Sequence, residues 1–226
     1  VLFEWDGDHR ELPSFPTRRS TDVGKNVRQV AMVDAQGNVG VHTGSRCISY
    51  ASHLTGKNYS VQANIMAKPT VPSAMVQAFE STTGDLAERM LAALDAAEVE
   101  GGDLRGRQSA AILVVSGEPT GDPWTDRIVD LEVADHEYPL IELRRLLRIS
   151  KAYRHAQRGD EYMEKNEMDN ALQEYSAATK LYPENPELPF WTAVTLAQTG
   201  ELQEALSIFK DRSEEHTSEL QSRAYL

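Results

Sequence analysis

The sequence has few cysteines, no long apolar run and fewer basic than acidic residues, and each of these features excludes a class of protein. Of its 226 residues only Cys47 is a cysteine, so the chain can form neither an intrachain disulfide nor a zinc cluster of cysteines. No run approaches the ~18 consecutive apolar residues of a membrane-spanning helix. Basic residues are outnumbered, 23 Lys and Arg against 35 Asp and Glu, giving a formal net charge of −12. An acidic surface repels phosphate backbones, so we expect neither nucleic acid nor membrane as a partner.

Motifs for cofactor and metal chemistry are missing as well. The sequence contains neither a glycine-rich phosphate loop nor an HExxH zinc motif. Acidic residues gather between positions 126 and 136, but Asp130 and Glu132 alternate with Val129 and Val133. This alternation is typical of a strand with one face in solvent. We therefore expect no metal ion and no cofactor.

Both ends of the chain look foreign to the rest. Arg212–Ser222 reads RSEEHTSELQS and Phe15–Asp22 reads FPTRRSTD, and both resemble translations of sequencing adapters. We interpret residues 1–22 and 212–226 as artefactual segments and exclude them from fold reasoning. No signal peptide is evident. The expected location is the cytoplasm by default, and export stays open because we expect the true N-terminus to be absent.

The first half of the remaining chain predicts a β-hairpin and a further strand. Residues 28–34 alternate apolar and polar side chains, a turn follows at Ala35-Gln36-Gly37, and Val39 and Val41 continue a second strand. Thr43-Gly44 is interpreted as the turn that ends this hairpin. Tyr59–Ile65 alternates again and predicts a third strand.

Two helices and a second hairpin are predicted next. One helix runs from about Val71 to Glu80; another follows Thr83, its predicted N-cap, and stops at Gly101-Gly102 because glycine adopts the left-handed C-terminal conformation without strain. Ser109–Val115 is a short apolar run, predicted to be a strand buried on both faces. The Gly- and Pro-rich loop after it would close a hairpin onto residues 127–133.

Three segments resemble one family closely. They are VRQVAMVDAQGNVGVHTG (Val27–Gly44), NYSVQANIM (Asn58–Met66) and GGDLRGRQSAAILVV (Gly101–Val115). The family is bacterial and uncharacterised, known as domain of unknown function 1028, and is placed by fold among the Ntn hydrolases. The resemblance extends over about Val27–Arg148 and implies that the family's N-terminal part is missing. We predict an α+β protein with a partial Ntn-hydrolase-like domain, a layered antiparallel sheet with helices, at residues 23–148.

The resemblance also bears on catalysis. In Ntn hydrolases the first residue of the mature chain is Thr, Ser or Cys; its side chain attacks an amide carbonyl and its own amino group acts as the base. Val1 has no nucleophilic side chain. The nucleophile is therefore expected in the missing N-terminal part, no catalytic residue is assigned to this chain, and the fragment is predicted to be inactive.

Two groups of polar side chains are candidate pocket residues. Gln62 and Asn64 share one face of the predicted strand 59–65. They either donate hydrogen bonds into a pocket or bond across the sheet.

The second group follows the double glycine. It consists of Asp103, Arg105, Gln108 and Ser109. In one interpretation Arg105 anchors an anion or a carboxylate, while Gln108 and Ser109 donate to an oxyanion. In the other, which we favour, Asp103 and Arg105 pair within a turn.

Cys47 and His53 invite a nucleophile–base interpretation. A lone cysteine beside the apolar Ile48 is more often a small packed residue, and no third group in the sequence orients His53. We therefore expect no catalytic pair here.

The C-terminal part matches the tetratricopeptide motif. The matching residues are Gly159, Tyr162, Ala171, Tyr175, Ala178, Pro183, Gly200, Ala205 and Phe209. Ala171 and Ala205 are 34 residues apart, which is the period of this repeat. His155 and Arg158 depart from the motif, which usually has Trp and Leu there. After a helix from Pro139 to about Tyr153, we predict an α-helical tetratricopeptide-like array over 149–211.

Two functions from different classes remain open at this point. One is an amide-bond hydrolase of unknown substrate, implied by the resemblance, with repeats that bind a protein. The other is a non-catalytic scaffold that recruits partners through the repeats. The expected partners are a peptide or a protein, together with a homodimer.

Overall fold

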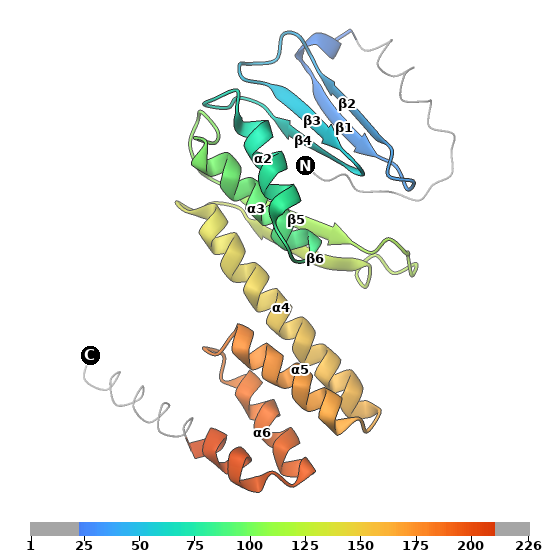
Figure 1. The fold of residues 1–226 in the computed structure, drawn as a ribbon, viewed down its shortest axis with the longest axis vertical. Helices are drawn as coiled ribbons and strands as arrows, with labels where there is room; N and C mark the ends of the chain where they lie inside the picture. The colour runs from blue at the N-terminus through green and yellow to red at the C-terminus, as the bar shows by residue number, and fades with distance from the viewer. Residues whose placement is uncertain (1–22, 211–226) are drawn as a thin grey trace, which may run out of the picture. The chain divides into compact units, whose positions relative to one another are not determined.

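The computed structural model describes residues 23–210 and divides the chain into two compact units, Val1–Arg144 and Arg145–Leu226 (Figure 1). The predicted artefactual segments, 1–22 and 212–226, lie outside the described residues. The division falls close to the domain boundary predicted at residue 148.

The first unit begins with a short 3₁₀ helix, η1 (Lys25–Val27), and the predicted hairpin of β1 (Gln29–Val33) and β2 (Val39–Thr43). Gln29 lies opposite Thr43, and Val33 lies opposite Val39. Thr43 is the last residue of β2, so its interpretation as part of a turn was wrong.

A second hairpin follows, formed by β3 (Ser52–Gly56) and β4 (Tyr59–Ala63). Strand β4 agrees with the predicted third strand. Strand β3 was not predicted, because its sequence SHLTG has one large apolar residue and no alternation. It is specified instead by its pairing with β4, which is a tertiary effect.

The two hairpins lie along each other and are joined at both ends. At one end the side chain of Gln29 donates to the carbonyl oxygens of Ser52 and Ala63. At the other end a Cβ on Gly37 would lie 2.4 Å from the side-chain oxygen of Asn58, so the two turns touch. This arrangement fixes the relative position of β2 and β3, which flank the candidate site.

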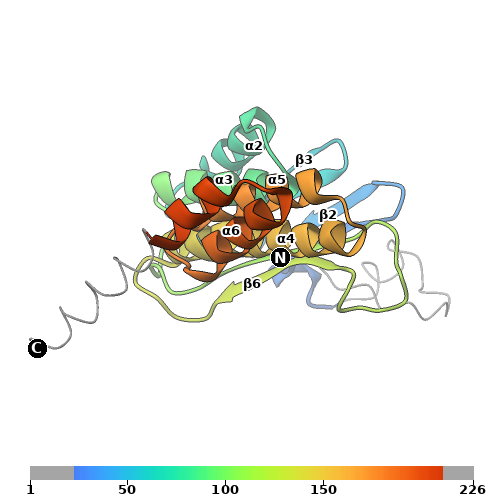
Figure 2. The same ribbon diagram turned by 90° about the horizontal axis from the view of Figure 1, so that it is seen from below.

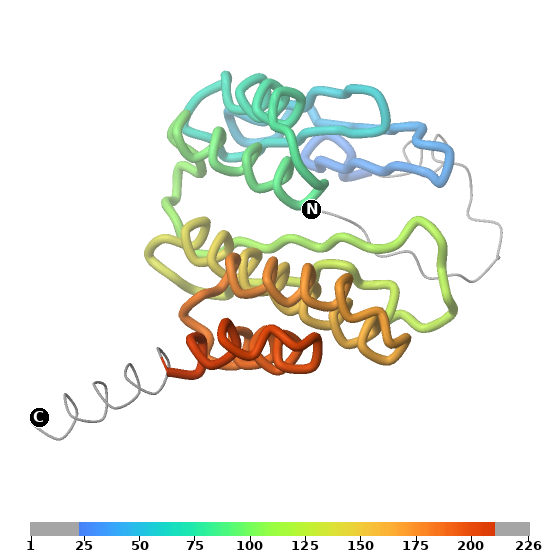
Figure 3. Tube along the Cα trace, turned by 60° about the horizontal axis from the view of Figure 1, so that its bottom comes forward, coloured from blue at the N-terminus to red at the C-terminus, as the bar shows by residue number. Residues whose placement is uncertain are grey.

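Helices α2 (Val71–Ser81) and α3 (Leu86–Val99) pack against each other, and α2 also packs against β3 and β4 (Figures 1 and 3). The N-cap of α3 is Asp85 and not the predicted Thr83. Asp85 accepts a hydrogen bond from the Glu88 backbone while the Glu88 side chain accepts from the Asp85 backbone, a complete capping box. Gly101 and Gly102, with φ of 116° and 60°, end the helix as predicted.

The third pair of strands is the antiparallel hairpin of β5 (Ala110–Val115) and β6 (Arg127–Val133). Strand β5 was predicted to be buried on both faces, and this was wrong. Within β5 only Ile112 is buried, and Val115 is 55% exposed. In β6 the acidic residues are exposed as predicted, since Asp130 and Glu132 alternate with buried valines.

The second unit is helical (Figure 2). Helix α4 (Pro139–Glu164) begins in the first unit and continues well beyond the predicted end near Tyr153. It is followed by α5 (Met168–Leu181), α6 (Glu187–Thr199) and a helical segment at 202–210. No helix within 23–210 is long and apolar enough to cross a membrane.

Small residues set the close packing of α4 on α5. A Cβ on Gly159 would lie 2.6 Å from the ring of Tyr175, so glycine is needed there. The Tyr175 hydroxyl donates to Asp160 over 2.6 Å. Burial and this hydrogen bond raise the pKa of Tyr175.

The elements of the two units confirm the predicted α+β class, in which antiparallel strand pairs are followed by a helical array.

The departures from the repeat motif form a polar cluster between α4 and α5. Glu174 accepts from His155 Nδ1 or from Arg158, whose guanidinium lies 3.1 Å from its carboxylate. The His155 and Glu174 side chains are 29% and 21% exposed. Two polar residues, His155 and Arg158, thus stand where the motif usually has apolar ones, and Glu174 pairs with both.

Candidate functional site

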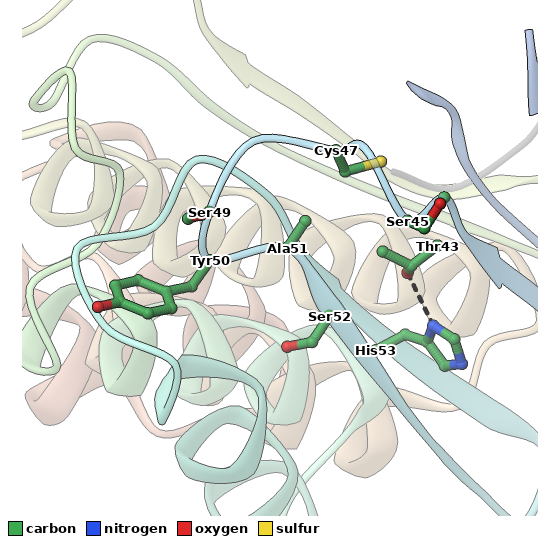
Figure 4. A pocket seen from close by; sticks show the side chains of 9 residues that line it. Thr43, Ser45, Cys47, Ser49, Tyr50, Ala51, Ser52 and His53 are labelled. Atoms are coloured by element: carbon green, nitrogen blue, oxygen red, sulfur yellow. Dashed lines mark hydrogen bonds between the residues drawn. The ribbon is translucent and has the colours of Figure 1, made fainter. Parts of the chain in front are cut away.

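An open pocket of about 470 Å³ lies at the connection between β2 and β3 (Figure 4). It is lined by the end of β2, the loop 44–51 and the start of β3. Its polar side chains are Thr43, Ser45, Cys47, Ser49, Tyr50, Ser52 and His53. Hydroxyl, thiol and imidazole groups thus surround one depression that is large enough for a small organic molecule.

Backbone hydrogen bonds hold the first part of the loop against η1. Gly44 donates to the carbonyl of Arg28, and Arg46 donates to that of Asn26, over 2.8 and 2.7 Å. A Cβ on Gly44 would lie 2.3 Å from the Asn26 carbonyl oxygen. Only glycine fits at this approach, and the loop therefore leaves β2 along one defined path.

A chain of hydrogen bonds connects three side chains at the edge of the pocket. Gln29 Nε2 lies 3.0 Å from Thr43 Oγ1, and Thr43 Oγ1 lies 2.8 Å from His53 Nδ1. An amide nitrogen can only donate, so Thr43 accepts from Gln29. The Thr43 hydrogen is then available to His53 Nδ1, in the imidazole tautomer that carries its proton on Nε2. Figure 4 shows the Thr43 and His53 side chains facing each other.

Cys47 lies in the same loop as a half-buried free thiol. Among the hydrogen bonds within residues 23–210, none joins this thiol to His53. From the sequence we expect no catalytic Cys47–His53 pair; in the structure His53 is hydrogen-bonded to Thr43.

Comparison with known proteins shows the family of the first unit. The sequence pattern described as "Family of unknown function (DUF1028)" matches residues 15–143. The chain belongs to this family. The crystal structure of the DUF1028 protein SPO2555 from Silicibacter pomeroyi is similar to it, with a TM-score of 0.50 and 30% sequence identity. The similarity covers 59% of this chain and 56% of that protein, so the chain spans little more than half of its relative's length.

The second unit has its own match. A TPR repeat pattern covers residues 159–200, which confirms the predicted tetratricopeptide array. Among curated proteins, no match to this chain was found.

The DUF1028 unit places Gln62 beside the pocket. Gln62 lies directly opposite His53 in the β3–β4 register, so the two side chains are neighbours on one face. Its amide nitrogen donates to the Ser60 hydroxyl over 2.6 Å. Asn64, the second candidate on this strand, follows β4 and is half-buried. Neither residue lines the β2–β3 pocket.

The second candidate group lies elsewhere in the DUF1028 unit. Arg105 donates to Asp103 over 2.6 and 2.9 Å, and these hydrogen bonds lower the pKa of the Asp103 carboxyl. This is the paired turn that the sequence favoured. The backbone of Asp103 forms an isolated antiparallel β-bridge with Met66, three residues after β4. Gln108 and Ser109, the other two candidates of this group, are exposed just before β5.

Sequence reasoning missed Gln29 as a site residue and assigned Thr43 to a turn. The sequence could have indicated this contact only through the register of the predicted hairpin, in which Gln29 lies opposite Thr43. In the described part of the chain, no cluster of three or more His, Cys, Asp or Glu residues could hold a metal ion.

Proposed function

We propose that the DUF1028 unit provides the substrate pocket of an amide-bond hydrolase and that the repeats bind a protein partner. The observation that carries the first part is the pocket between β2 and β3, which holds a hydroxyl–imidazole pair. The resemblance to Ntn hydrolases supports the same reaction class, by analogy of fold alone.

The pocket chemistry suits an amide. An amide presents one carbonyl acceptor and one N–H donor, and a hydroxyl–imidazole edge offers both complementary groups. The lining also contains the apolar surface of Tyr50 and Ala51. A small acyl group and its amide could therefore be held together in this pocket.

The test uses the full chain and a panel of N-acetyl amino acid amides, with binding followed by saturation-transfer NMR. Ala51 lines the pocket, so Ala51→Trp should fill it. Ala35 is exposed in the β1–β2 turn, and Ala35→Trp is the matched control. We expect at least one amide to bind the native chain and the control, and to bind Ala51→Trp at least about tenfold more weakly. Equal binding by all three proteins, or binding by none, would contradict the proposal.

A non-catalytic scaffold is the second candidate, favoured by the intact packing of the repeat. Phe190 and Trp191 on α6 are each 41% exposed and stack edge to face. Exposed aromatic pairs are frequent anchors in protein interfaces. A peptide array probed with the full chain should give spots that Trp191→Ala loses and that Tyr50→Ala, altered at an exposed aromatic residue of the other unit, keeps.

We also propose that the chain forms a homodimer, and sedimentation tests this. A dimer whose dissociation constant does not change in Trp191→Ala would use another surface. A monomer at all accessible concentrations would remove the dimer from the proposal.

A further inference from the structure

We propose that Thr43 is a nucleophile and His53 its general base, so that this chain itself accepts an acyl group at the β2–β3 pocket. The inference rests on the proposed function, because it names the groups that would cleave the amide held there. It departs from the N-terminal nucleophile that the family resemblance implies.

The first step of the argument is the contact between the two groups. Thr43 Oγ1 and His53 Nδ1 are 2.8 Å apart, which is within the reach required of a base that removes a hydroxyl proton. The two residues come from different strands, β2 and β3, and each strand is fixed in its own hairpin. The pair is therefore held by the fold and does not depend on a free loop.

The second step concerns the direction of the hydrogen bond. Gln29 donates to Thr43 Oγ1, and the same amide nitrogen lies 3.2 and 3.0 Å from the carbonyl oxygens of Ser52 and Ala63. These two carbonyls can only accept, so they fix the nitrogen side of the amide toward Thr43. Gln29 is thus a positioning residue that leaves the Thr43 proton available to the imidazole.

The third step is the comparison with the other nucleophiles of the pocket. Cys47, Ser45, Ser49 and Ser52 also line it. Within residues 23–210, the hydrogen bonds of the His53 ring reach the hydroxyl of Thr43 and none of these four side chains. Only Thr43 combines a place in the pocket with a base in contact.

The reaction follows from this arrangement. His53 Nδ1 takes the proton of Thr43 as Oγ1 bonds to the carbonyl carbon of the substrate. The carbon–nitrogen bond then breaks, and the imidazolium returns the proton to the leaving amine. Water, deprotonated by the same imidazole, attacks the threonyl ester and regenerates the hydroxyl. The overall reaction consumes one water and needs no oxidant or further reactant.

The test measures acylation of the full chain by p-nitrophenyl acetate, with the modified residue located by peptide mass spectrometry. We expect the acetyl group on Thr43. Thr43→Val, which keeps the shape and lacks the hydroxyl, and His53→Gln should each slow acylation by about 100-fold or more. Thr43→Ser should retain it. Thr55→Val, at an exposed residue of β3 that does not line the pocket, is the matched control and should match the native rate.

Two further readouts separate a catalytic role from a structural one. The native rate should depend on pH as an imidazole base requires, and this dependence should disappear in His53→Gln. Gln29→Leu should lower the rate while a circular dichroism spectrum of native form shows that the hairpins remain folded.

The outcomes distinguish this inference from the proposed function. Acetylation of Cys47 or of lysines alone, at a rate unchanged in Thr43→Val, overturns the nucleophile. If amides still bind the pocket in that case, the proposed function survives. Absence of both acylation and amide binding overturns the two together.

Discussion

The two units of this chain reach compactness by different means. Seven of the eleven buried apolar residues described in the DUF1028 unit are large or branched, and the other four are alanines. The large ones are Val61, Val71, Leu91, Ile112, Val129, Val133 and Leu143. Its two N-terminal hairpins are also joined by polar atoms. In the helical unit alanines make up five of the nine buried apolar residues, the others being Leu147, Tyr175, Leu188 and Leu196. The alanines are Ala152, Ala171, Ala178, Ala193 and Ala205. Alanine lets helix axes approach closely, whereas branched side chains fill the space above a pleated strand. The first unit should thus be sensitive to lost hydrogen bonds, and the second to any change of volume.

The largest expected effect comes from removing a fully buried large side chain that packs against two of these alanines. Leu188 is 1% exposed and packs with Ala152 and Ala178. Leu188→Ala should lower the free energy of unfolding of the helical unit by about 3 kcal/mol, because the surrounding helices relax only partly into the cavity. Hydrogen exchange measured by mass spectrometry should show lost protection in residues 150–205. Leu202→Ala, at an exposed leucine, is the control. Equal loss of protection throughout residues 29–133 would contradict the separation into two units.

The next effect tests the polar junction of the first unit. Gln29→Leu keeps the approximate volume and removes the donor shared by Thr43 and two carbonyls. Unpaired, partly buried acceptors should cost about 2 kcal/mol in a urea unfolding experiment. Gln36→Leu, in an exposed turn, should change stability by less than about 0.5 kcal/mol. If both variants behave alike, the hairpins are not held by this amide.

A smaller effect follows from adding one methyl group to the helical unit. Gly159→Ala gains about 1 kcal/mol of helix propensity. The new Cβ lies 2.6 Å from the ring of Tyr175, which is 2% exposed and bonded to Asp160, so the ring cannot easily move away. Overpacking costs about 2 kcal/mol, and the net loss should be about 1 kcal/mol in a thermal melt. Gly117→Ala, with nothing within 4 Å, should be neutral or stabilising. A stabilised Gly159→Ala would show that the interface has unused space.

The smallest effect is a dependence on alkaline pH. The hydrogen bond to Glu80, followed by burial, raises the pKa of Tyr59 to about 12 from 10.0. Because the pKa is higher in the folded state, the protonated Tyr59 stabilises the fold fully below pH 10. This contribution is lost as the pH rises through about 12. It should amount to less than about 1 kcal/mol. Tyr59→Phe should have a flatter unfolding free energy over this range than the native chain. An identical pH profile for the two proteins would show that the Tyr59–Glu80 hydrogen bond does not contribute to stability.

The parts of the fold that local chemistry specifies could be predicted from the sequence. Alternation in β1, β2, β4 and β6, the double glycine after α3 and the 34-residue spacing of Ala171 and Ala205 depend only on residues close in the chain or on a fixed period. Strand β3 and the exposure of Val115 depend on what packs against them. Sequence patterns do not carry that information for a short polar segment.

The candidate site could not be predicted for the same physical reason. Gln29, Thr43 and His53 are separated by 14 and 10 residues, and each is unremarkable in its own segment. Their meeting needs two hairpin registers and the contact of one hairpin with the other. By contrast, Asp103 and Arg105 are two residues apart, and their pairing was accessible from the sequence.

The polar cluster of His155, Arg158 and Glu174 has a consequence for how tightly the repeat can be covered. Repeats of this kind stack on one another, and each repeat normally covers an apolar face of its neighbour. Here an imidazole, a guanidinium and a carboxylate meet between two helices, and covering them completely would require removing the water that still reaches all three. The cluster therefore makes complete burial of this part of the α4–α5 pair costly, because its three polar groups keep their favourable energy only while they stay paired or partly hydrated.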